Sequence, residues 1–246
     1  MRIALMADLH ANREALTACL AHARHQRAER HVFLGDLVGY NADPAWTVAT
    51  VMDLVAKGAV ALRGNHDRAV AEPSERMTPD ATAAIAWTRG QLGDAARRFL
   101  EDLPLQIEDE DRLYVHAEAP PGLRWRYVLD ADDAERCLKA TQARYAFCGH
   151  VHLPALYGVA PLGRTATFRP VDGIPVELTT RRRWFAVLGS VGQPRDGNPA
   201  AAYSIFDTER RELTCHRVPY DIDSTADKIR RAGLPEALAQ RLSRGR

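Results

Sequence analysis

Residues 3–10 read IALMADLH, a short apolar run that ends in an acid and a histidine. Apolar runs of the same kind recur at residues 32–34 (VFL) and 60–62 (VAL). Between them, Asn12 and the pair Asp43–Pro44 are typical of helix starts, and apolar residues follow them at helical spacing. The order strand, helix, strand, helix, strand predicts a parallel sheet covered by helices, and therefore an α/β fold.

The rest of the chain continues this pattern and then changes. Helical spacing is predicted at about residues 79–100 and 130–140, and strands at residues 113–115 and 145–148. After Pro154, short apolar segments separated by Gly and Pro turns indicate antiparallel strands. These strands are expected at residues 156–159, 165–168, 176–178, 185–188, 203–206 and 213–218.

Length and composition indicate one globular unit. The chain has 246 residues, of which 46% are hydrophobic, so it can bury a sizeable core. No segment resembles an interior linker, and a single domain over residues 1–246 is expected, ending in a pair of helices from about residue 221. A formal net charge of +1 gives no electrostatic reason to expect a nucleic-acid-binding surface.

The cysteines and the N-terminus bear on the cellular compartment. The four cysteines form no CxxC pair, so reduced thiols and a cytoplasmic location are expected. The first ten residues meet an acid and a histidine too early for a signal peptide. No apolar stretch approaches the length of a membrane span, so no membrane partner is expected.

Polar residues follow the ends of five predicted strands. They are Asp8 and His10, Asp36, Asn65 and His66, His116, and His150 and His152. Because ligands in open α/β sheets bind outside the carboxyl ends of the strands, two carboxylates, an amide and five imidazoles are expected at one edge. In a chain of this composition GHxH would occur by chance roughly 0.02 times and GNHD below about 0.001 times, so both motifs are specific.

Such a cluster is costly to desolvate unless it binds something, and a pair of metal ions would satisfy it. Two cations about 3.5–4 Å apart, bridged by a carboxylate, supply a nucleophile and charge stabilisation for phosphate-ester hydrolysis. Mixed imidazole and carboxylate ligands suit Mn, Fe, Zn, Ni or Co, and disfavour Ca and Mg. We therefore expect two divalent ions per chain, with Mn the first choice, and a small-molecule phosphate ester as substrate.

The five blocks D-x-H, GDxxG, GNHD, a strand-end histidine and GHxH span residues 8–152 and resemble the signature of the calcineurin-like metallophosphoesterases. The stretch GSVGQPRDG at residues 189–197 resembles a loop of the small prokaryotic phosphodiesterase branch of that family. The resemblance implies a four-layer α-β-β-α sandwich of two mixed sheets, with the dimetal site at the strand carboxyl ends. It also implies a phosphodiesterase or phosphatase that acts on a nucleotide-like ester, with water activated between the two ions.

The resemblance assigns a role to each strand-end residue. The metal ligands would form two sets with one shared member: Asp8, His10 and His152 for one ion, Asn65, His116 and His150 for the other, and Asp36 for both. His66 would bind no metal. It would donate a proton to the leaving oxygen or stabilise the transition state. Asp67 either orients His66 or acts as a surface cap.

Two features depart from this pattern or lie outside it. The branch usually has His-Gly-Ser/Ala-Pro where residues 116–120 read HAEAP, so Glu118 adds a carboxylate near the site and leaves the local loop shape open. The loop Gly192–Gly197 is either a hairpin turn with exposed polar residues or a cover over the metal edge that brings Arg195 to the substrate. In the second case the loop comes from this chain or from a symmetric partner, which allows a homodimer.

Two other functions remain open. A metallophosphoesterase fold can serve as a non-catalytic binding scaffold, but a scaffold would not need His66. Protein Ser/Thr phosphatases share the metal core, but they carry phosphate-gripping arginines in its motifs, and here GDLVGY and GNHDR offer only Arg68. The small-molecule phosphoesterase is therefore the preferred prediction.

Overall fold

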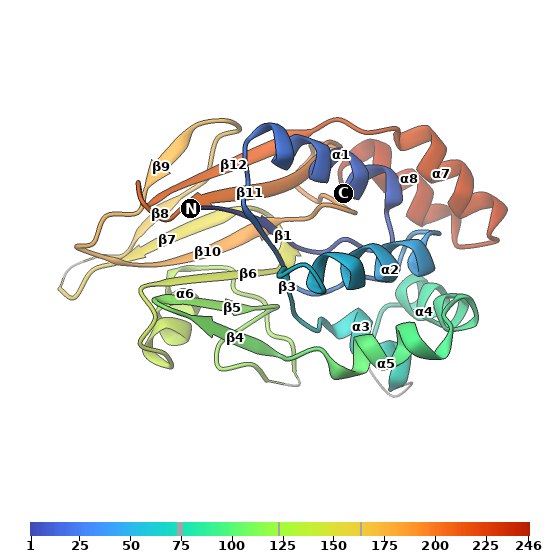
Figure 1. Cartoon of the computed structure of the whole chain (residues 1–246), viewed down its shortest axis with the longest axis horizontal. Helices are drawn as coiled ribbons and strands as arrows, with labels where there is room; N and C mark the ends of the chain where they lie inside the picture. Colours follow the sequence, from blue (N-terminus) through green and yellow to red (C-terminus); the bar gives the residue numbers. More distant parts are fainter. Residues whose placement is uncertain (73–75, 123, 163) are drawn as a thin grey trace.

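The computed structural model describes residues 1–72, 76–122, 124–162 and 164–246, and its core is two six-stranded sheets (Figure 1). Sheet A has the strand order β3-β2-β1-β11-β12-β9. Its strands are β1 (Arg2–Met6), β2 (Arg30–Phe33), β3 (Val60–Ala61), β9 (Pro175–Glu177), β11 (Ala201–Asp207) and β12 (Glu212–Val218). Sheet B has the order β4-β5-β6-β10-β7-β8. Its strands are β4 (Gln106–Asp109), β5 (Arg112–Val115), β6 (Tyr145–His152), β7 (Ala155–Val159), β8 (Ala166–Phe168) and β10 (Arg183–Gly189).

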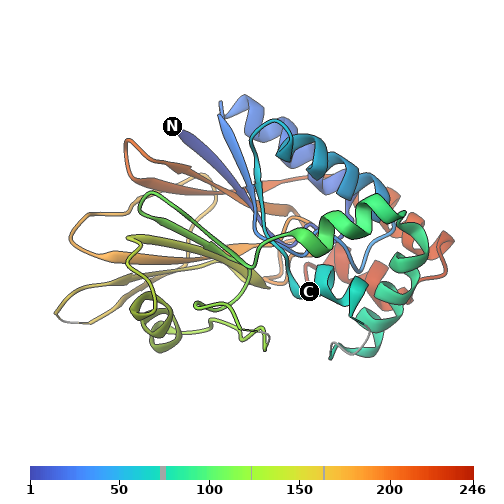
Figure 2. The same cartoon turned by 60° about the horizontal axis from the view of Figure 1, so that its bottom comes forward.

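Helices complete the outer layers and one end of the molecule. On the outside of sheet A lie α1 (Arg13–His25) and α2 (Pro44–Val55), and α6 (Ala131–Lys139) covers sheet B (Figures 1 and 2). The remaining helices gather beyond one end of the strands (Figure 1): α3 (Asn65–Ala71), α4 (Pro79–Gln91), α5 (Asp94–Asp102), α7 (Ile222–Arg231) and α8 (Glu236–Arg244). The expected four-layer sandwich of two mixed sheets is confirmed.

The alternation of side chains along β1 shows how the layers are built. Ile3 and Leu5 belong to the core between the two sheets, where they share a cluster with Phe147 of β6. Ala4 and Met6 belong to the core between sheet A and its helices. Because successive residues of a strand face opposite sides, one fully buried strand serves both cores.

The order of elements predicted from the first third of the chain is confirmed, since β1, β2 and β3 are parallel neighbours. Asn12 caps α1 and accepts a hydrogen bond from the Ala15 N–H at 3.0 Å. Asp43 precedes α2 but makes no side-chain cap, because its carboxylate pairs with Lys228 of α7 at 2.7 Å. The predicted pair of C-terminal helices is present as α7 and α8.

The prediction of antiparallel strands after Pro154 is partly wrong. Strand β10 pairs antiparallel with β7 on one side but parallel with β6 on the other. Its residues from Trp184 onward are all buried, so its own sequence carries no signal that distinguishes the two directions. The region 79–100 is two helices, with Gly93 between them, and β4 and α3 were not predicted.

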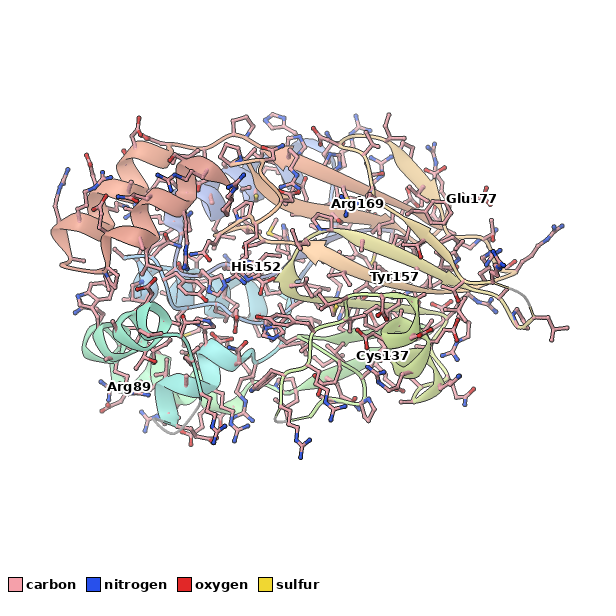
Figure 3. The ribbon with its side chains drawn as sticks, turned by 180° about the vertical axis from the view of Figure 1, so that it is seen from behind. Arg89, Cys137, His152, Tyr157, Arg169 and Glu177 are labelled. Carbon is pink, nitrogen blue, oxygen red and sulfur yellow. The ribbon has the colours of Figure 1, made fainter. Side chains whose placement is uncertain are left out.

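The carboxyl ends of the parallel strands of both sheets point to the end where the helices gather. Figure 3 shows His152 in this region, between the strands and the helices. Among the described residues, no helix is both long enough and apolar enough to cross a membrane.

Candidate metal centre

The structure brings the eight strand-end residues together at one edge of the sandwich. They are Asp8 and His10 after β1, Asp36 after β2, Asn65 and His66 at the start of α3, His116 after β5, and His150 and His152 at the end of β6. All except Asn65 are buried. β6 extends through both of its histidines, whereas the sequence predicted a strand that ends at Cys148.

Two sets of possible ligand atoms lie side by side. In the first set, the Nε2 atom of His152 lies 3.4 Å from Asp8 Oδ1 and 3.2 Å from His10 Nε2. In the second, the Nε2 atom of His116 lies 3.2 Å from Asn65 Oδ1. Each set contains three Asp or His side chains whose ligand atoms lie within 4.8 Å of one another: Asp8, His10 and His152, and Asp36, His116 and His150.

Asp36 faces both sets of ligand atoms. Its Oδ1 lies 3.4 Å from His116 Nε2, and its Oδ2 lies 3.8 Å from His10 Nε2. The Oδ1 atom also accepts the backbone N–H of His66 at 2.8 Å, which fixes the orientation of the carboxylate. A carboxylate placed in this way has one oxygen available to each of two cations.

Backbone carbonyls decide which nitrogen of each histidine carries the proton. The Nδ1 atoms of His10, His116 and His152 lie 2.6–3.1 Å from the carbonyl oxygens of residues 38, 34 and 193, respectively. In His150 it is Nε2 that lies 2.8 Å from the Trp125 carbonyl oxygen. Because a carbonyl only accepts, each of these nitrogens must donate, and in a neutral ring the other nitrogen then has a lone pair.

The lone pairs of His10 and His152 then face each other across 3.2 Å. Burial lowers the pKa of His10 well below its ordinary value, with the neighbouring His66 acting in the same direction, so its ring is neutral near pH 7. Two facing lone pairs repel unless a cation lies between them, which is a metal ion or, in its absence, a proton. The donor set therefore fits a metal with nitrogen and oxygen ligands.

The backbone at these residues is strained. Positive φ angles between 52° and 67° occur at Asp8, Asp36, His150 and His152, and His10 has φ 48°. Left-handed backbone is uncommon for residues other than glycine, and it persists where the surroundings enforce it, as at functional sites.

His66 differs from the other four histidines because no carbonyl holds its ring. Its Nδ1 has no hydrogen-bond partner among the described residues, and its Nε2 lies 4.0 Å from Asp36 Oδ2. Burial, opposed by Asp36, lowers the pKa of His66 to about 4. Its ring packs against the bare backbone of Gly39, which has φ +92°, and against Tyr40, with ring centroids 4.5 Å apart.

We expect Gly39→Ala to lower turnover, because a methyl group at this position would collide with the His66 ring. Gly58→Ala is the matched control, since Gly58 has φ +99° and nothing within 4 Å of an added Cβ. Both variants should lose stability through left-handed strain, by about 1–2 kcal/mol. Denaturant unfolding and turnover of bis-p-nitrophenyl phosphate measure the two effects. Equal turnover in both variants would show that the position of His66 is unimportant.

Asp67 is a helix cap, as one of its two predicted roles had it, but it is buried and not at the surface. Its side chain accepts the backbone N–H of Gly64 at the start of α3, and also those of Leu37 and Val38. None of these bonds involves the His66 ring. It ties the loop after β2 to the start of α3, and in this way fixes the backbone on both sides of Asp36.

The loop Gly192–Gly197 lies against the strand ends of its own chain that carry the candidate metal ligands. The Gly192 N–H donates to the Asp8 carbonyl at 2.9 Å, and the Gln193 carbonyl is the partner of His152. Arg195 donates to Tyr40 Oη at 3.3 Å and to Gln193 Oε1 at 3.1 Å. The loop is not a hairpin turn, because it joins strands of different sheets, and of its polar residues Gln193 is buried and Asp196 is exposed. This placement requires no second subunit.

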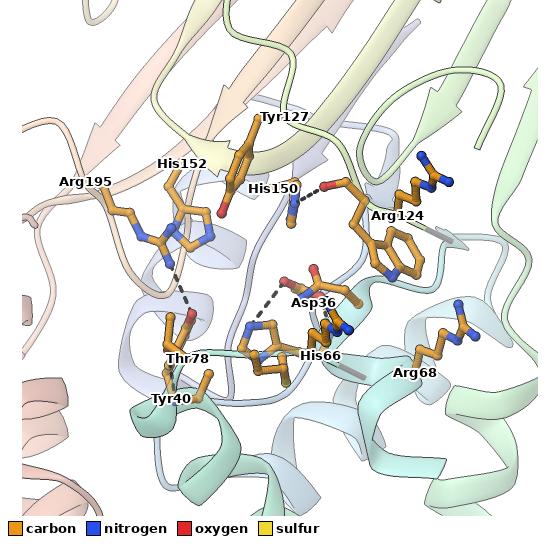
Figure 4. A pocket seen from close by; sticks show the side chains of 15 residues that line it. Asp36, Tyr40, His66, Arg68, Thr78, Arg124, Tyr127, His150, His152 and Arg195 are labelled. Carbon is orange, nitrogen blue, oxygen red and sulfur yellow. Dashed lines mark hydrogen bonds and ion pairs between the residues drawn. The ribbon is translucent and has the colours of Figure 1, made fainter. Parts of the chain in front are cut away.

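A cavity of about 820 Å³ opens above the two sets of ligand atoms (Figure 4). Arg195 lines it on one side and Arg124 on the other. The ring of Tyr127 stacks on His150, with centroids 4.5 Å apart, and is 47% exposed. Trp125 is buried in the wall. A cavity of this size is typical of sites for small molecules.

The segment RWRY at residues 124–127 was missed as part of the site. Its alternation of arginine and aromatic residues, which suits phosphates and bases, is the signal that could have found it. Glu118 holds this segment in place, because its carboxylate accepts the Arg126 backbone N–H at 2.5 Å. Glu118 does not line the cavity, so its effect on the site is through the shape of the loop.

Comparison with known proteins agrees with this geometry. The model of the calcineurin-like phosphoesterase superfamily domain matches residues 1–211. An uncharacterised protein of Methanocaldococcus jannaschii is 32% identical, over 99% of this chain and 98% of its own length. The crystal structure of a metallophosphoesterase from Sphaerobacter thermophilus is 36% identical with a TM-score of 0.88, covering 100% of this chain and 99% of that one.

A hypothetical protein from Pyrococcus horikoshii shares the fold, with a TM-score of 0.82 at 18% identity, covering 100% of this chain and 98% of that one. At that identity the likeness concerns the fold alone. The range of the family model, residues 1–211, includes all the strand-end motifs. The chain therefore belongs to the calcineurin-like phosphoesterase superfamily.

Proposed function

We propose that the chain is a phosphodiesterase or phosphatase that hydrolyses a small, nucleotide-like phosphate ester and depends on two divalent metal ions, with Mn the first candidate. The observation that carries the proposal is the distance of 3.2 Å between the Nε2 atoms of His10 and His152, whose Nδ1 atoms both lie beside carbonyl oxygens. One ion would be held by Asp8, His10 and His152, the other by Asn65, His116 and His150, and both by Asp36. When bound, such ions supply a deprotonated water at neutral pH and positive charge for the phosphoryl oxygens.

The residues of the chain itself would bind the ester and assist the departure of its leaving group. His66 lines the cavity and would donate to the leaving oxygen. A pKa of about 4 leaves the His66 ring neutral near pH 7, so this role requires the charge of the bound phosphate to raise that pKa. Arg195 would contact the part of the substrate that is not cleaved. The exposed face of Tyr127 offers a stacking surface for a base.

The geometry favours this function over a scaffold. All eight strand-end side chains converge, and the cavity opens directly onto Asp36, His66 and His150. A scaffold has no use for a buried His66 beside a ligand cluster. Two of the arginines in the cavity wall, Arg124 and Arg195, come from segments outside the metal-core motifs, which distinguishes the site from that expected of a protein Ser/Thr phosphatase.

We expect the protein, stripped with a chelator and then supplied with Mn, to hydrolyse bis-p-nitrophenyl phosphate or p-nitrophenyl phosphate. A phosphopeptide should be a poor substrate, because a cavity of about 820 Å³ suits a small molecule. Release of p-nitrophenol and phosphate measures the reaction, and the stripped protein without added metal is the control. Failure of every divalent metal to restore hydrolysis of either small ester would contradict the proposal.

A further inference from the structure

Tyr40 lies between the residue proposed to protonate the leaving group and the residue proposed to bind the rest of the substrate. It follows Gly39 in the loop after β2, is 6% exposed and lines the cavity. The centroid of its ring lies 4.5 Å from that of His66 and 4.5 Å from that of His10. Its hydroxyl oxygen accepts a hydrogen bond from Arg195 at 3.3 Å. Figure 4 shows Tyr40 beside His66, with a dashed line to Arg195.

The ring of His66 is held by packing. Its Nδ1 has no hydrogen-bond partner among the described residues, and a Cβ added at Gly39 would lie 2.3 Å from this atom. The rings of Tyr40 and His10 pack against it, the second with centroids 4.8 Å apart. His10 is fixed by its own carbonyl partner. Removal of the Tyr40 ring would therefore open a space into which the His66 ring could turn.

Arg195 is oriented by two uncharged acceptors. Its Nη2 donates to Tyr40 Oη and, at 3.1 Å, to Gln193 Oε1. Its guanidinium carbon lies 5.8 Å from the centre of the Tyr40 ring, within the range of a cation–π contact. No carboxylate within the described part of the chain forms an ion pair with Arg195. Its charge and its other N–H groups are therefore available to a ligand in the cavity, which it lines.

We infer that Tyr40 is a positioning residue for both groups, through its ring for His66 and through its hydroxyl for Arg195. This inference rests on the proposed function. The two parts of the side chain then control different quantities. The ring sets how well the acid meets the leaving oxygen, and therefore kcat for esters with poor leaving groups. The hydroxyl sets where the guanidinium meets the part of the substrate that is not cleaved, and therefore KM.

The first experiment removes the hydroxyl and keeps the ring. The p-nitrophenyl ester of thymidine 5′-monophosphate carries a nucleoside on the part that is not cleaved, and bis-p-nitrophenyl phosphate has the same leaving group without it. In assays with Mn, Tyr40→Phe should raise KM for the nucleotide ester by roughly fivefold, the effect of one lost hydrogen bond. Its kcat, and its KM for bis-p-nitrophenyl phosphate, should barely change. Calorimetry should show the same loss of affinity for thymidine 5′-monophosphate.

The second experiment removes the ring as well. Tyr40→Leu does so directly, and Tyr40→Met fills more of the space and replaces it if Tyr40→Leu does not fold. For the phenyl ester of thymidine 5′-monophosphate, whose leaving oxygen needs a proton, kcat should fall by roughly 10²-fold, the cost of misplacing a catalytic group by about 1 Å. For the p-nitrophenyl ester the loss should be smaller. Elemental analysis should find the metal content unchanged, because His10 keeps its carbonyl partner.

Double variants separate positioning from a general loss of stability. If the hydroxyl acts through Arg195, Tyr40→Phe should add nothing to the effect of Arg195→Ala on KM. If the ring acts through His66, Tyr40→Leu should add nothing to the loss of kcat in His66→Ala. The matched controls are Tyr203→Phe and Tyr203→Leu, because Tyr203 is 1% exposed, lies outside the cavity and pairs with His22 through its hydroxyl at 2.7 Å. The controls should lose stability in denaturant but keep KM and kcat.

The inference is overturned if the Tyr40 variants match the Tyr203 controls in KM and kcat, or if their effects add in full to those of Arg195→Ala and His66→Ala. An equal loss of kcat on the phenyl and p-nitrophenyl esters in Tyr40→Leu or Tyr40→Met overturns it as well. In these cases the unmodified protein still hydrolyses the esters, and the proposed function stands. Failure of the unmodified protein to hydrolyse any of the esters with any divalent metal refutes the proposed function, and the inference with it.

Discussion

Asp36→Asn is expected to abolish turnover and to lower the metal content at both sites. The substitution keeps the shape of the side chain, and its carbonyl oxygen can still accept the His66 backbone N–H that Asp36 Oδ1 accepts at 2.8 Å. The fold should therefore survive. An amide lacks the charge and the second oxygen that a carboxylate offers to two cations, so both sites should weaken together. Elemental analysis of the protein after dialysis, together with turnover of bis-p-nitrophenyl phosphate, measures both effects.

Asp53→Asn is the control for Asp36→Asn. Asp53 is exposed on α2, so its substitution removes the same charge far from the cavity. Its metal content and turnover should equal those of the unmodified protein. Two metals per chain and near-normal turnover in Asp36→Asn would show that Asp36 does not bridge. Loss of only one metal would place Asp36 in a single site.

His66→Ala should leave the metal content nearly unchanged and lower turnover by roughly 10²–10⁴-fold, the range for lost acid–base catalysis. The ring has no carbonyl partner and faces the cavity, which suits a group that acts on the substrate. The loss should be smaller for an ester with a good leaving group such as p-nitrophenol, because that oxygen leaves without a proton. A series of aryl phosphate esters with different leaving-group pKa values measures this dependence.

The metal content of His66→Ala also tests whether His66 is itself a metal ligand. His10, Asp36 and His66 form a third group whose ligand atoms lie within 4.8 Å of one another. Loss of a metal ion in His66→Ala would make His66 a ligand. An equal loss of turnover on good and poor leaving groups would argue against proton donation. Stabilisation of the transition state would then be the role that remains for His66.

The sequence predicted the parallel half of the fold because the signal there is local. Strands such as β1 and β2 are short apolar runs, and each is followed by a helix with a readable start, as at Asn12. Strand β10 shows the limit of such signals. A strand buried on both faces looks alike in either direction, so its parallel pairing with β6 depends on long-range contacts that its sequence does not contain.

Within the site, too, features with a local signal were predictable from the sequence, and features that depend on long-range contacts were not. The strand-end residues were found because their positions follow from the sheet, and the structure brings all eight together. Arg124 and Trp125 were missed because they lie in a segment without regular structure, and their place in the cavity wall depends on two tertiary bonds. One is the bond between Glu118 and the Arg126 N–H, and the other joins the Trp125 carbonyl to His150.

The left-handed backbone at Asp8, Asp36, His150 and His152 restricts how this site can change in evolution. Aspartate, asparagine and histidine are the side chains that tolerate this conformation best after glycine, and aspartate and histidine are also the commonest ligands in this site. Most other replacements would weaken folding as well as metal binding, so selection would remove them even from a protein that no longer needed catalysis. A descendant released from catalysis would therefore drift toward glycine or asparagine at these turns, because these residues adopt the left-handed conformation with the least strain. Such replacements in a relative would mark the loss of the reaction while the sandwich itself persisted.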